Sequence, residues 1–598
     1  MGRSCNTMAS MTEMNVDQAL AIARELHVTG RLNEAVDVYQ QILQRYPEHA
    51  EAWHMRGVAI SQLGKPADGL QSIDRAIQLA PDVTQYQVNR AVVLAQLGRI
   101  DEAIGSIRQA IARGGSGDTA ETHYNLAHLL DRQGNLDEAI AEYRRALDLK
   151  SDYAQAWNGL GSTLKKKGQT DDAIAAFRQA TVLQPQYVDA FNRLAKALDE
   201  EDRVEESAAA YERAAQLQPQ SPEAQGALGN IYHRAGRFED AINAFNAALK
   251  LRPGYAEALY SIANVQKDQG KLDEAIATFD QAVAARGVYS EAQWNRALTL
   301  LLKGDFENGW KAYESRWTDQ ARLLPRPLWD GKDLEGKRIL LRLEQGLGDI
   351  IQFIRYAPMV AERGGKVVVQ CPQPLKRLLE GQCNIETVVS FQEPAPDYDL
   401  HYPLLSLPAL FGTTLQTIPN DVPYLLADAT LAQTWADRMN GEPGGLKVGI
   451  AWAGNPEYVH DRQRTISPAA LKPLGEVEHV RFYSLQKGPQ LLGGSSVAPF
   501  PMVDWADDLK DFADTAGLIS NLDLVIACDT AVAHLAGAMG RNVWTLLPYS
   551  PDWRWMLGRG DSPWYPTMRL FRQPGPGDWA SVIDEVKMEL RKQGGGGK

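Results

Sequence analysis

The N-terminal half of the chain places apolar residues at helical spacing, and the whole pattern repeats. A small residue recurs every 34 residues, with one interval of 36, at Gly57, Ala91, Ala127, Gly161, Ala195, Gly229, Ala263 and Ala297. A glycine follows seven residues later in every unit but one, where Asp202 replaces it. Apolar stripes separated by a turn predict two amphipathic helices per unit, and the small residue lets them approach closely. From Val16 to roughly Trp317 the pattern predicts about nine helix pairs.

The segment Ala156–Ala180, AWNGLGSTLKKKGQTDDAIAAFRQA, shows most clearly which repeat this is. It combines small, aromatic and alanine positions within a period of 34 residues, and the region therefore resembles the tetratricopeptide repeat. A helical solenoid of another class is the alternative. The resemblance implies an all-α superhelix that binds proteins or peptides.

Three asparagines lie two residues before the small position on the first helix of their repeats: Asn89, Asn125 and Asn295. An amide side chain both donates to and accepts from a peptide group. In the O-GlcNAc transferases a similar asparagine ladder holds the backbone of a protein substrate. The similarity implies that these three residues bind a protein acceptor, although the ladder is broken. Ordinary polar residues on a solvated face are the alternative interpretation.

After about Pro325 the repeat ends, and short apolar, β-branched runs alternate with segments of helical length. The runs are Arg338–Leu343, Lys366–Gln370, Lys447–Trp452, Arg481–Leu485, Leu522–Cys528 and Asn542–Leu547. Continuous apolar strands between helices predict parallel sheets covered on both faces. Gly441–Leu446 is the best break between two halves, which predicts two Rossmann-like lobes with a cleft between them. One continuous large sheet is the alternative.

The predicted fold class is therefore α plus α/β, with five segments along the chain. They are a disordered N-terminus at 1–15, a solenoid at 16–320, a first lobe at 321–440, a second lobe at 441–593 and a tail at 594–598.

Composition limits the partners and the compartment. The chain of 598 residues carries 62 Lys and Arg against 75 Asp and Glu, a net charge of −13 without a basic block, which argues against nucleic acid. Four cysteines without metal-ligand spacing argue against a disulfide framework or a zinc site. No apolar run reaches the length of a membrane span, and the first residues lack a secretory signal. We therefore expect a cytoplasmic protein.

One candidate chemical residue follows the first predicted strand, in the segment Glu344–Phe353. Two glycines permit a tight turn between strand and helix, and Asp349 arrives at the helix start, facing the predicted cleft. A carboxylate at this place can act as a base, or it can simply cap the helix.

The second lobe supplies the other candidates, all at strand ends. Asp529, Thr530 and His534 begin a helix, and the free N–H groups of a helix N-terminus suit a diphosphate. A purely structural histidine is the alternative for His534. Asn455 and Arg464 lie on a polar loop after another strand, and Lys487 follows the next; cationic groups there suit phosphate oxygens, and an exposed loop is the alternative.

With these residues assembled, the chain resembles a bacterial family in which tetratricopeptide repeats are fused to a heptosyltransferase-like glycosyltransferase of the two-lobed GT-B type. The phrases EQGLGDIIQFIRYAP and LLPYSPDWRWMLGRGDSPWYPTMRLFRQ are typical of it. The layout is also similar to O-GlcNAc transferases and flagellin-modifying glycosyltransferases. The resemblance implies that Asp349 is the general base and that Asp529, Thr530, His534 and Arg464 bind the donor.

The implied activity is an inverting, metal-independent transfer of a sugar from a nucleotide sugar to Ser or Thr of a protein held by the repeats, with flagellin as one candidate acceptor. No cofactor is expected. Two alternatives stay open: a glycosyltransferase that extends a glycan or lipid and uses the repeats for assembly, and a non-catalytic scaffold with a degenerate transferase domain.

Overall fold

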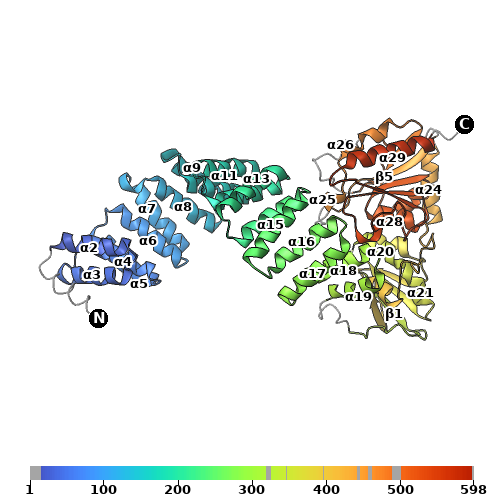
Figure 1. The fold of residues 1–598 in the computed structure, drawn as a ribbon, viewed down its shortest axis with the longest axis horizontal. Coiled ribbons are helices and arrows are strands. Elements are labelled where there is room, and N and C mark those ends of the chain that lie inside the picture. Colours follow the sequence, from blue (N-terminus) through green and yellow to red (C-terminus); the bar gives the residue numbers. More distant parts are fainter. Residues whose placement is uncertain are drawn as a thin grey trace. The chain divides into compact units, whose positions relative to one another are not determined.

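Figure 1 shows the computed structural model of the chain. It describes residues 15–317, 325–344, 346–394, 396–440, 445–455, 461–487 and 500–594. The N-terminal segment predicted as disordered and the predicted tail lie outside these residues except for Asn15 and Gly594, as do four residues of the predicted break between the lobes. The chain divides into two compact units, Met1–Ala235 and Gly236–Lys598.

Unit 1 consists of helices that pack in consecutive pairs. They are α2 (Val16–Val28), α3 (Leu32–Arg45), α4 (Ala50–Gln62), α5 (Pro66–Leu79), α6 (Thr84–Gln96), α7 (Ile100–Ala112), α8 (Ala120–Gln133), α9 (Leu136–Leu149), α10 (Ala154–Lys166), α11 (Thr170–Leu183), α12 (Val188–Glu200), α13 (Val204–Leu217) and α14 (Pro222–Arg234). The 36-residue interval is explained by a short 3-10 turn, η1 (Gly115–Gly117), between α7 and α8.

The repeated small residues and turn residues have the roles that the sequence predicts. A Cβ atom at Gly57 would lie 2.6 Å from Cγ1 of Ile73 on the paired helix, so only glycine fits there. Gly64 turns the chain with φ of 82°, a conformation that glycine adopts at no steric cost. Asp202, which replaces the glycine in one repeat, adopts the same left-handed region with φ of 59°. The exception therefore keeps the turn geometry, at the strain expected of a residue with a side chain.

Unit 2 begins with five further helices of the repeat pattern, which continue directly into the α/β region (Figure 1). They are α15 (Phe238–Leu251), α16 (Ala256–Asp268), α17 (Leu272–Arg286), α18 (Ser290–Lys303) and α19 (Phe306–Tyr313), followed by the 3-10 turn η2 (Glu314–Arg316).

Two separate sheets follow, and every strand pair in them is parallel. The first has the order β3-β2-β1-β4, with β1 (Arg338–Arg342), β2 (Lys366–Cys371), β3 (Ile385–Ser390) and β4 (Leu400–Pro403). The second has the order β6-β5-β7-β8-β9, with β5 (Leu446–Ala451), β6 (Val480–Ser484), β7 (Leu524–Cys528), β8 (Val543–Leu547) and β9 (Met568–Arg572). The six predicted strands are all present, and the single-sheet alternative is not what the structure has.

Helices connect the strands and cover the sheets. In the first lobe they are α20 (Leu347–Phe353), η4 (Ile354–Tyr356), α21 (Ala357–Ala361), η5 (Gln373–Leu375), α22 (Lys376–Leu379), η6 (Leu404–Ser406) and α23 (Leu407–Leu410). Helix α24 (Ala429–Met439) precedes the predicted break but packs against the second lobe, where Arg438 pairs with Asp508. In the second they are α25 (Asp461–Arg464), α26 (Pro468–Leu471), η7 (Lys472–Glu476), α27 (Phe512–Ile519), α28 (Ala531–Ala538), η8 (Trp553–Trp555) and α29 (Trp579–Gly594).

Strand β7 shows that the second sheet is buried on both faces. Leu524 and Ile526 pack into a cluster with Val586 and Leu590 of α29, whereas Val525 and Ala527 face the opposite cluster, which contains residues of α28. This explains why the strand reads as a continuous apolar run instead of an alternating one.

The last repeat shares one core with both lobes. Trp310 of α19 meets Trp553 of the second lobe with ring centroids 5.3 Å apart and nearly perpendicular rings, and it also meets Phe353 of the first lobe at 6.3 Å. Phe306 lies 6.1 Å from Trp564. The indole N–H of Trp310 donates to the carbonyl of Thr413 at 3.0 Å, so this buried ring is also satisfied as a donor.

A buried polar network makes a second link between the last repeat and the first lobe. Nε of Arg316 in η2 lies 3.0 Å from Oε2 of Glu344, just after β1, and its Nη2 donates to Oγ of Ser406 at 2.6 Å. Ser406 in turn donates to Glu314 at 2.7 Å. Arg316 is thereby paired and hydrogen bonded at the ends of β1 and β4, as a buried charge requires.

Replacement of Trp310 tests how much the shared core stabilises unit 2. We expect Trp310→Ala to lower the free energy of unfolding by about 3–5 kcal/mol, because it removes a large ring and leaves a cavity. Phe391→Ala, at a site where the ring is 53% exposed, should change it by less than about 0.5 kcal/mol. Urea unfolding followed by tryptophan fluorescence reports on this unit, since of the 14 tryptophans only Trp53 and Trp157 lie outside it. An equal decrease in the free energy of unfolding in Trp310→Ala and Phe391→Ala would contradict this expectation.

Candidate functional site

The beginnings of two helices, one from each lobe, meet in unit 2. Helix α20 follows β1, helix α28 follows β7, and the two helices pack against each other. A Cβ atom at Gly348 would lie 2.9 Å from Cδ2 of His534, so the absent side chain is what allows the contact. We predicted that the two glycines before Asp349 serve a tight turn, but neither has a positive φ. Glycine is required at position 348 because α20 approaches His534 of α28 closely there.

Asp349 lies at this junction and uses both carboxylate oxygens. Its Oδ2 accepts the backbone N–H of Gly346 at 3.1 Å, which caps the start of α20. Its Oδ1 accepts a hydrogen bond from the guanidinium of Arg554. The side chain is 20% exposed, so a ligand can still reach it. Burial raises the pKa of the Asp349 carboxyl, and the neighbouring Arg554 opposes this shift.

Arg554 is a site residue that our sequence reasoning missed. It lies in η8, on the segment between β8 and β9, and bonds to Oε1 of Gln352 at 2.5 Å and to Oδ1 of Asp552 at 2.8 Å. Only 8% of its side chain is exposed. The run Asp-Trp-Arg-Trp after a predicted strand draws attention to this segment, but it does not show that Arg554 contacts Asp349, 205 residues away.

Thr530 occupies the N-cap position of α28, but its side chain makes no capping hydrogen bond. The residue is 8% exposed, its Oγ1 has no hydrogen-bond partner among the described residues, and it makes no bond to the first amides of the helix. A buried hydroxyl without a partner costs free energy. The start of α28 therefore has no side-chain cap, and the buried hydroxyl beside it is unsatisfied within the described residues.

His534, one turn into α28, is a neutral imidazole. Burial, together with the nearby cations Arg554 and Arg355, lowers its pKa well below the ordinary value. Its Nδ1 lies 2.9 Å from the hydroxyl of Tyr565, and its Nε2 lies 3.8 Å from Oδ1 of Asp529. His534 is therefore placed to form hydrogen bonds and not to supply positive charge at neutral pH.

Arg464 reaches the same place from the end of β5. Its Nη1 donates to the backbone carbonyl of Asp529 at 2.8 Å, and its Nε donates to Oδ1 of Asp461 at 2.9 Å. Burial and the neighbouring Asp552 carboxylate raise the pKa of Asp529 to about 6. Strands β5 and β7 are adjacent, and the strand order reverses between them, which is where open parallel sheets bind ligands.

Two predicted donor residues stand apart from this group. Lys487, after β6, donates through Nζ to the carbonyls of Leu509 and Lys510 before α27, and the described residues show no contact between it and Asp529. Asn455 is exposed and lies at the end of a described segment, on the same loop as Arg464. The structure therefore brings together Asp349, Arg464, Asp529, Thr530 and His534, whereas the described contacts of Lys487 lie before α27.

The three asparagines of the repeats differ in their surroundings. Nδ2 of Asn89 lies 2.7 Å from Nε2 of His54, 35 residues earlier, and burial lowers the pKa of His54 to about 4, so its ring accepts this bond. Nδ2 of Asn295 donates to the hydroxyl of Tyr260, again 35 residues earlier, at 3.0 Å. Asn125 has no such bond among the described contacts. Asn89 and Asn295 thus link consecutive repeats, and acceptor binding by the three asparagines stays a prediction.

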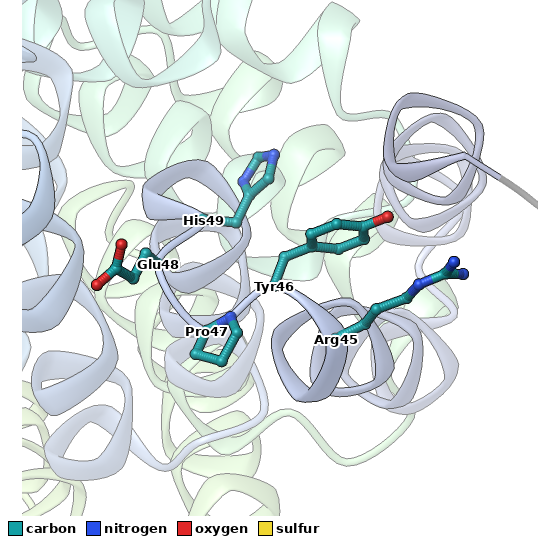
Figure 2. A pocket seen from close by; sticks show the side chains of 5 residues that line it. All are labelled: Arg45, Tyr46, Pro47, Glu48 and His49. Carbon is teal, nitrogen blue, oxygen red and sulfur yellow. The ribbon is translucent and has the colours of Figure 1, made fainter.

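A surface hollow of ≈ 600 Å³ lies elsewhere, at the turn between α3 and α4. Figure 2 shows its lining side chains, Arg45, Tyr46, Pro47, Glu48 and His49. It contains none of the predicted site residues. Over the residues that the structure describes, no group of three or more His, Cys, Asp or Glu is arranged to hold a metal ion, and no helix is long and apolar enough to cross a membrane.

Family comparisons concern the repeats. Residues 87–303 match the family described as Cilia and flagella-associated protein 70 C-terminal domain, and residues 20–83 match the tetratricopeptide repeat. Among solved structures, MamA is 26% identical with a TM-score of 0.27, covering 29% of this chain and 93% of its own. YrrB, described as a TPR protein with an unusual peptide-binding site, is 24% identical with a TM-score of 0.30, covering 32% of this chain and 98% of its own.

Two curated proteins are similar in sequence to parts of this chain. Protein FlbA of Caulobacter vibrioides is 29% identical over 333 residues, which are 50% of this chain and 54% of that protein. Tetratricopeptide repeat protein 13 of Homo sapiens is 34% identical over 102 residues, 16% of this chain and 12% of that protein. The chain thus spans about half the length of FlbA and a small part of the human relative. Together with the helix pairs, the family matches identify the N-terminal half as a tetratricopeptide-repeat region.

Proposed function

We propose that the chain is a protein O-glycosyltransferase of the two-lobed GT-B type. It transfers a sugar from a nucleotide sugar to Ser or Thr of a protein bound by the repeats. The observation that carries the proposal is the uncapped start of α28, which packs against the helix that carries Asp349. The Thr530 hydroxyl there has no partner among the described residues, and Arg464 is near enough to oppose the rise that burial causes in the pKa of Asp349. An anion site beside a buried carboxylate is the pair of features that transfer from a sugar diphosphate needs.

In this mechanism the donor diphosphate binds at the start of α28. The amides of the helix, the Thr530 hydroxyl and Arg464 stabilise the charge that develops on the leaving group. Asp349 accepts the proton of the acceptor hydroxyl as that oxygen attacks the anomeric carbon. Both oxygens of Asp349 already accept one hydrogen bond each, but a carboxylate offers about four lone-pair sites, so an acceptor hydroxyl can still donate to it.

The acceptor follows from the repeats. Solenoids of this kind present extended surfaces that bind proteins, and the amide of Asn125 suits a peptide backbone. Flagellin is one candidate, which rests on the resemblance to flagellin-modifying glycosyltransferases. The proposal also includes a reducing, cytoplasmic setting, which suits the unpaired thiols of Cys371, Cys383 and Cys528.

A non-catalytic scaffold is the second candidate, because the contacts of Asp349 with Gly346 and Arg554 also serve structure alone. Intact-mass analysis of flagellin incubated with the chain and candidate nucleotide sugars tests the choice. A mass gain of one sugar supports the proposal. Transfer to a glycan or lipid in place of the protein would favour the glycan- or lipid-extending enzyme, and neither transfer nor hydrolysis of any nucleotide sugar would favour the scaffold.

Thr530→Val tests the donor site. The change keeps the shape and removes a hydroxyl that has no partner, so stability should not fall. We expect affinity for nucleoside diphosphates to fall by about ten- to a hundred-fold, the effect of one hydrogen bond to a charged group at roughly 1.5–3 kcal/mol. Calorimetric titration measures this. Thr545→Val is the matched control, because Thr545 of β8 is also buried with an unpartnered hydroxyl. Unchanged affinity in Thr530→Val would place the donor elsewhere.

Asp349→Asn tests the base. Asparagine can still accept the Gly346 N–H, but it cannot take a proton, so we expect turnover to fall by about 10²–10⁴-fold with donor affinity unchanged. The change also leaves Arg554 without the negative charge of its Asp349 partner, which can lower stability. Activity is therefore measured at a temperature well below the thermal unfolding midpoint of the variant. Glu344→Gln is the control. Glu344 lies five residues before Asp349, is also a largely buried carboxylate and is also paired with an arginine, Arg316. Wild-type turnover by Asp349→Asn would exclude the catalytic role.

A further inference from the structure

The segment between β8 and β9 connects the last repeats with the candidate site inside unit 2. At its beginning, Oγ of Ser550 donates to Oδ1 of Asp268 in α16 at 2.6 Å, and the ring of Tyr549 stacks on Phe238 of α15 at 6.3 Å. Further along, a Cβ atom at Gly304 would lie 2.8 Å from Cε of Met556. Helices α15, α16 and α18 therefore fix this segment on both sides of η8.

Within η8, Arg554 is held from every side. Its guanidinium lies 4.5 Å from the ring of Trp553 and 5.7 Å from that of Phe353. Its polar contacts reach Asp349 and Gln352 of the first lobe and Asp552 of its own segment. The planar group thus has one orientation, and that orientation directs one of its nitrogens at Asp349.

Stability alone gives little reason for this arrangement. Burial of an ion pair costs desolvation that the attraction only partly offsets, and apolar residues of similar volume are often as stable. The pair also lies where the two lobes meet, between the start of α28 on one side and the rings of Trp553 and Phe353 on the other. Arg554 extends from the second lobe to Asp349, the proposed base, in the first lobe. A fixed cation in this position would orient the carboxylate of the base and favour its ionised form.

We propose that Arg554 is a positioning residue for the transfer: it holds the Asp349 carboxylate in its ionised form and in a fixed orientation toward the acceptor. This inference rests on the proposed function, and it adds a residue and a role that the resemblance does not supply. Arg554 does not touch the transferred sugar in this account. It acts only through Asp349.

The test compares the pH dependence of kcat/KM in three variants of the full chain. Arg554→Met removes the charge but keeps most of the volume, Arg554→Lys keeps the charge, and Arg572→Met is the matched control. Arg572 is half-buried and also anchors this segment, but through the carbonyls of Arg559 and Trp555, and its described hydrogen bonds include no carboxylate. Affinity for a nucleoside diphosphate is measured beside each profile.

The expected direction follows from charge. Removal of a cation beside a carboxylate raises the pKa of that carboxylate, and a base works only when it is deprotonated. In Arg554→Met we therefore expect the acid limb of the profile to move up by at least about one pH unit. On the plateau we expect kcat to fall about tenfold or more, with donor affinity within about twofold. In Arg554→Lys and Arg572→Met the limb should stay at its wild-type position.

The outcomes separate this proposal from the function on which it rests. A wild-type chain without transferase activity would overturn the proposed function itself. If the wild-type chain is active and Asp349→Asn is inactive, an unmoved acid limb in Arg554→Met would overturn the role of Arg554 alone. An equal movement in Arg572→Met would also overturn it, because the effect would then come from the segment and not from the charge. A double-mutant cycle of Arg554→Met and Asp349→Asn on the thermal midpoint needs no activity, and additive shifts would show that the pair is uncoupled.

Discussion

The arrangement of unit 2 depends on one aromatic cluster, in which Trp310 of the last repeat packs between Phe353 of the first lobe and Trp553 of the second. Large rings bury much apolar area in perpendicular and offset contacts that tolerate little displacement. Phe353 ends α20, which begins close to Asp349, and Trp553 is the neighbour of Arg554. The cluster that holds the repeats against the lobes therefore also sets the distance between the proposed base and its cation.

A consequence of this packing is a buried site with many charges. Asp349, Asp529, Asp552, Arg464 and Arg554 lie close enough to influence one another across the junction of the lobes. Burial is the main cause of two shifts in the site: it raises the pKa of Asp529 to about 6 and lowers the pKa of His534 well below its ordinary value. An incoming diphosphate would meet a helix N-terminus and Arg464 there, but also carboxylates that repel it. The proposed donor would therefore have to match the hydrogen-bond donors of the site closely to offset that repulsion.

Much of the fold was predictable from the sequence, and the exceptions have physical reasons. The repeat and six strands were found because their periodicity is local. Strands β3 (Ile385–Ser390), β4 (Leu400–Pro403) and β9 (Met568–Arg572) were missed, since β3 and β9 lie at sheet edges with partly exposed or charged residues, and β4 has only four residues. In the site, strand-end position located Asp349 and Asp529. Arg554 comes into contact with Asp349 from 205 residues away, and no local pattern encodes such a contact.

The boundary between the two compact units is a second feature that local sequence patterns do not predict. The 34-residue rhythm runs through Ala235 and Gly236 without interruption, yet the compact units divide there. Periodicity predicts which residues of a helix pair face each other, but it does not predict where one compact unit ends. Which compact unit a repeat belongs to depends instead on apolar and polar contacts with distant residues, such as those of Trp310 with Trp553 and of Arg316 with Glu344. The last repeats are therefore tetratricopeptide repeats by sequence and part of the α/β unit by packing, and they shape the site through the segment that carries Arg554.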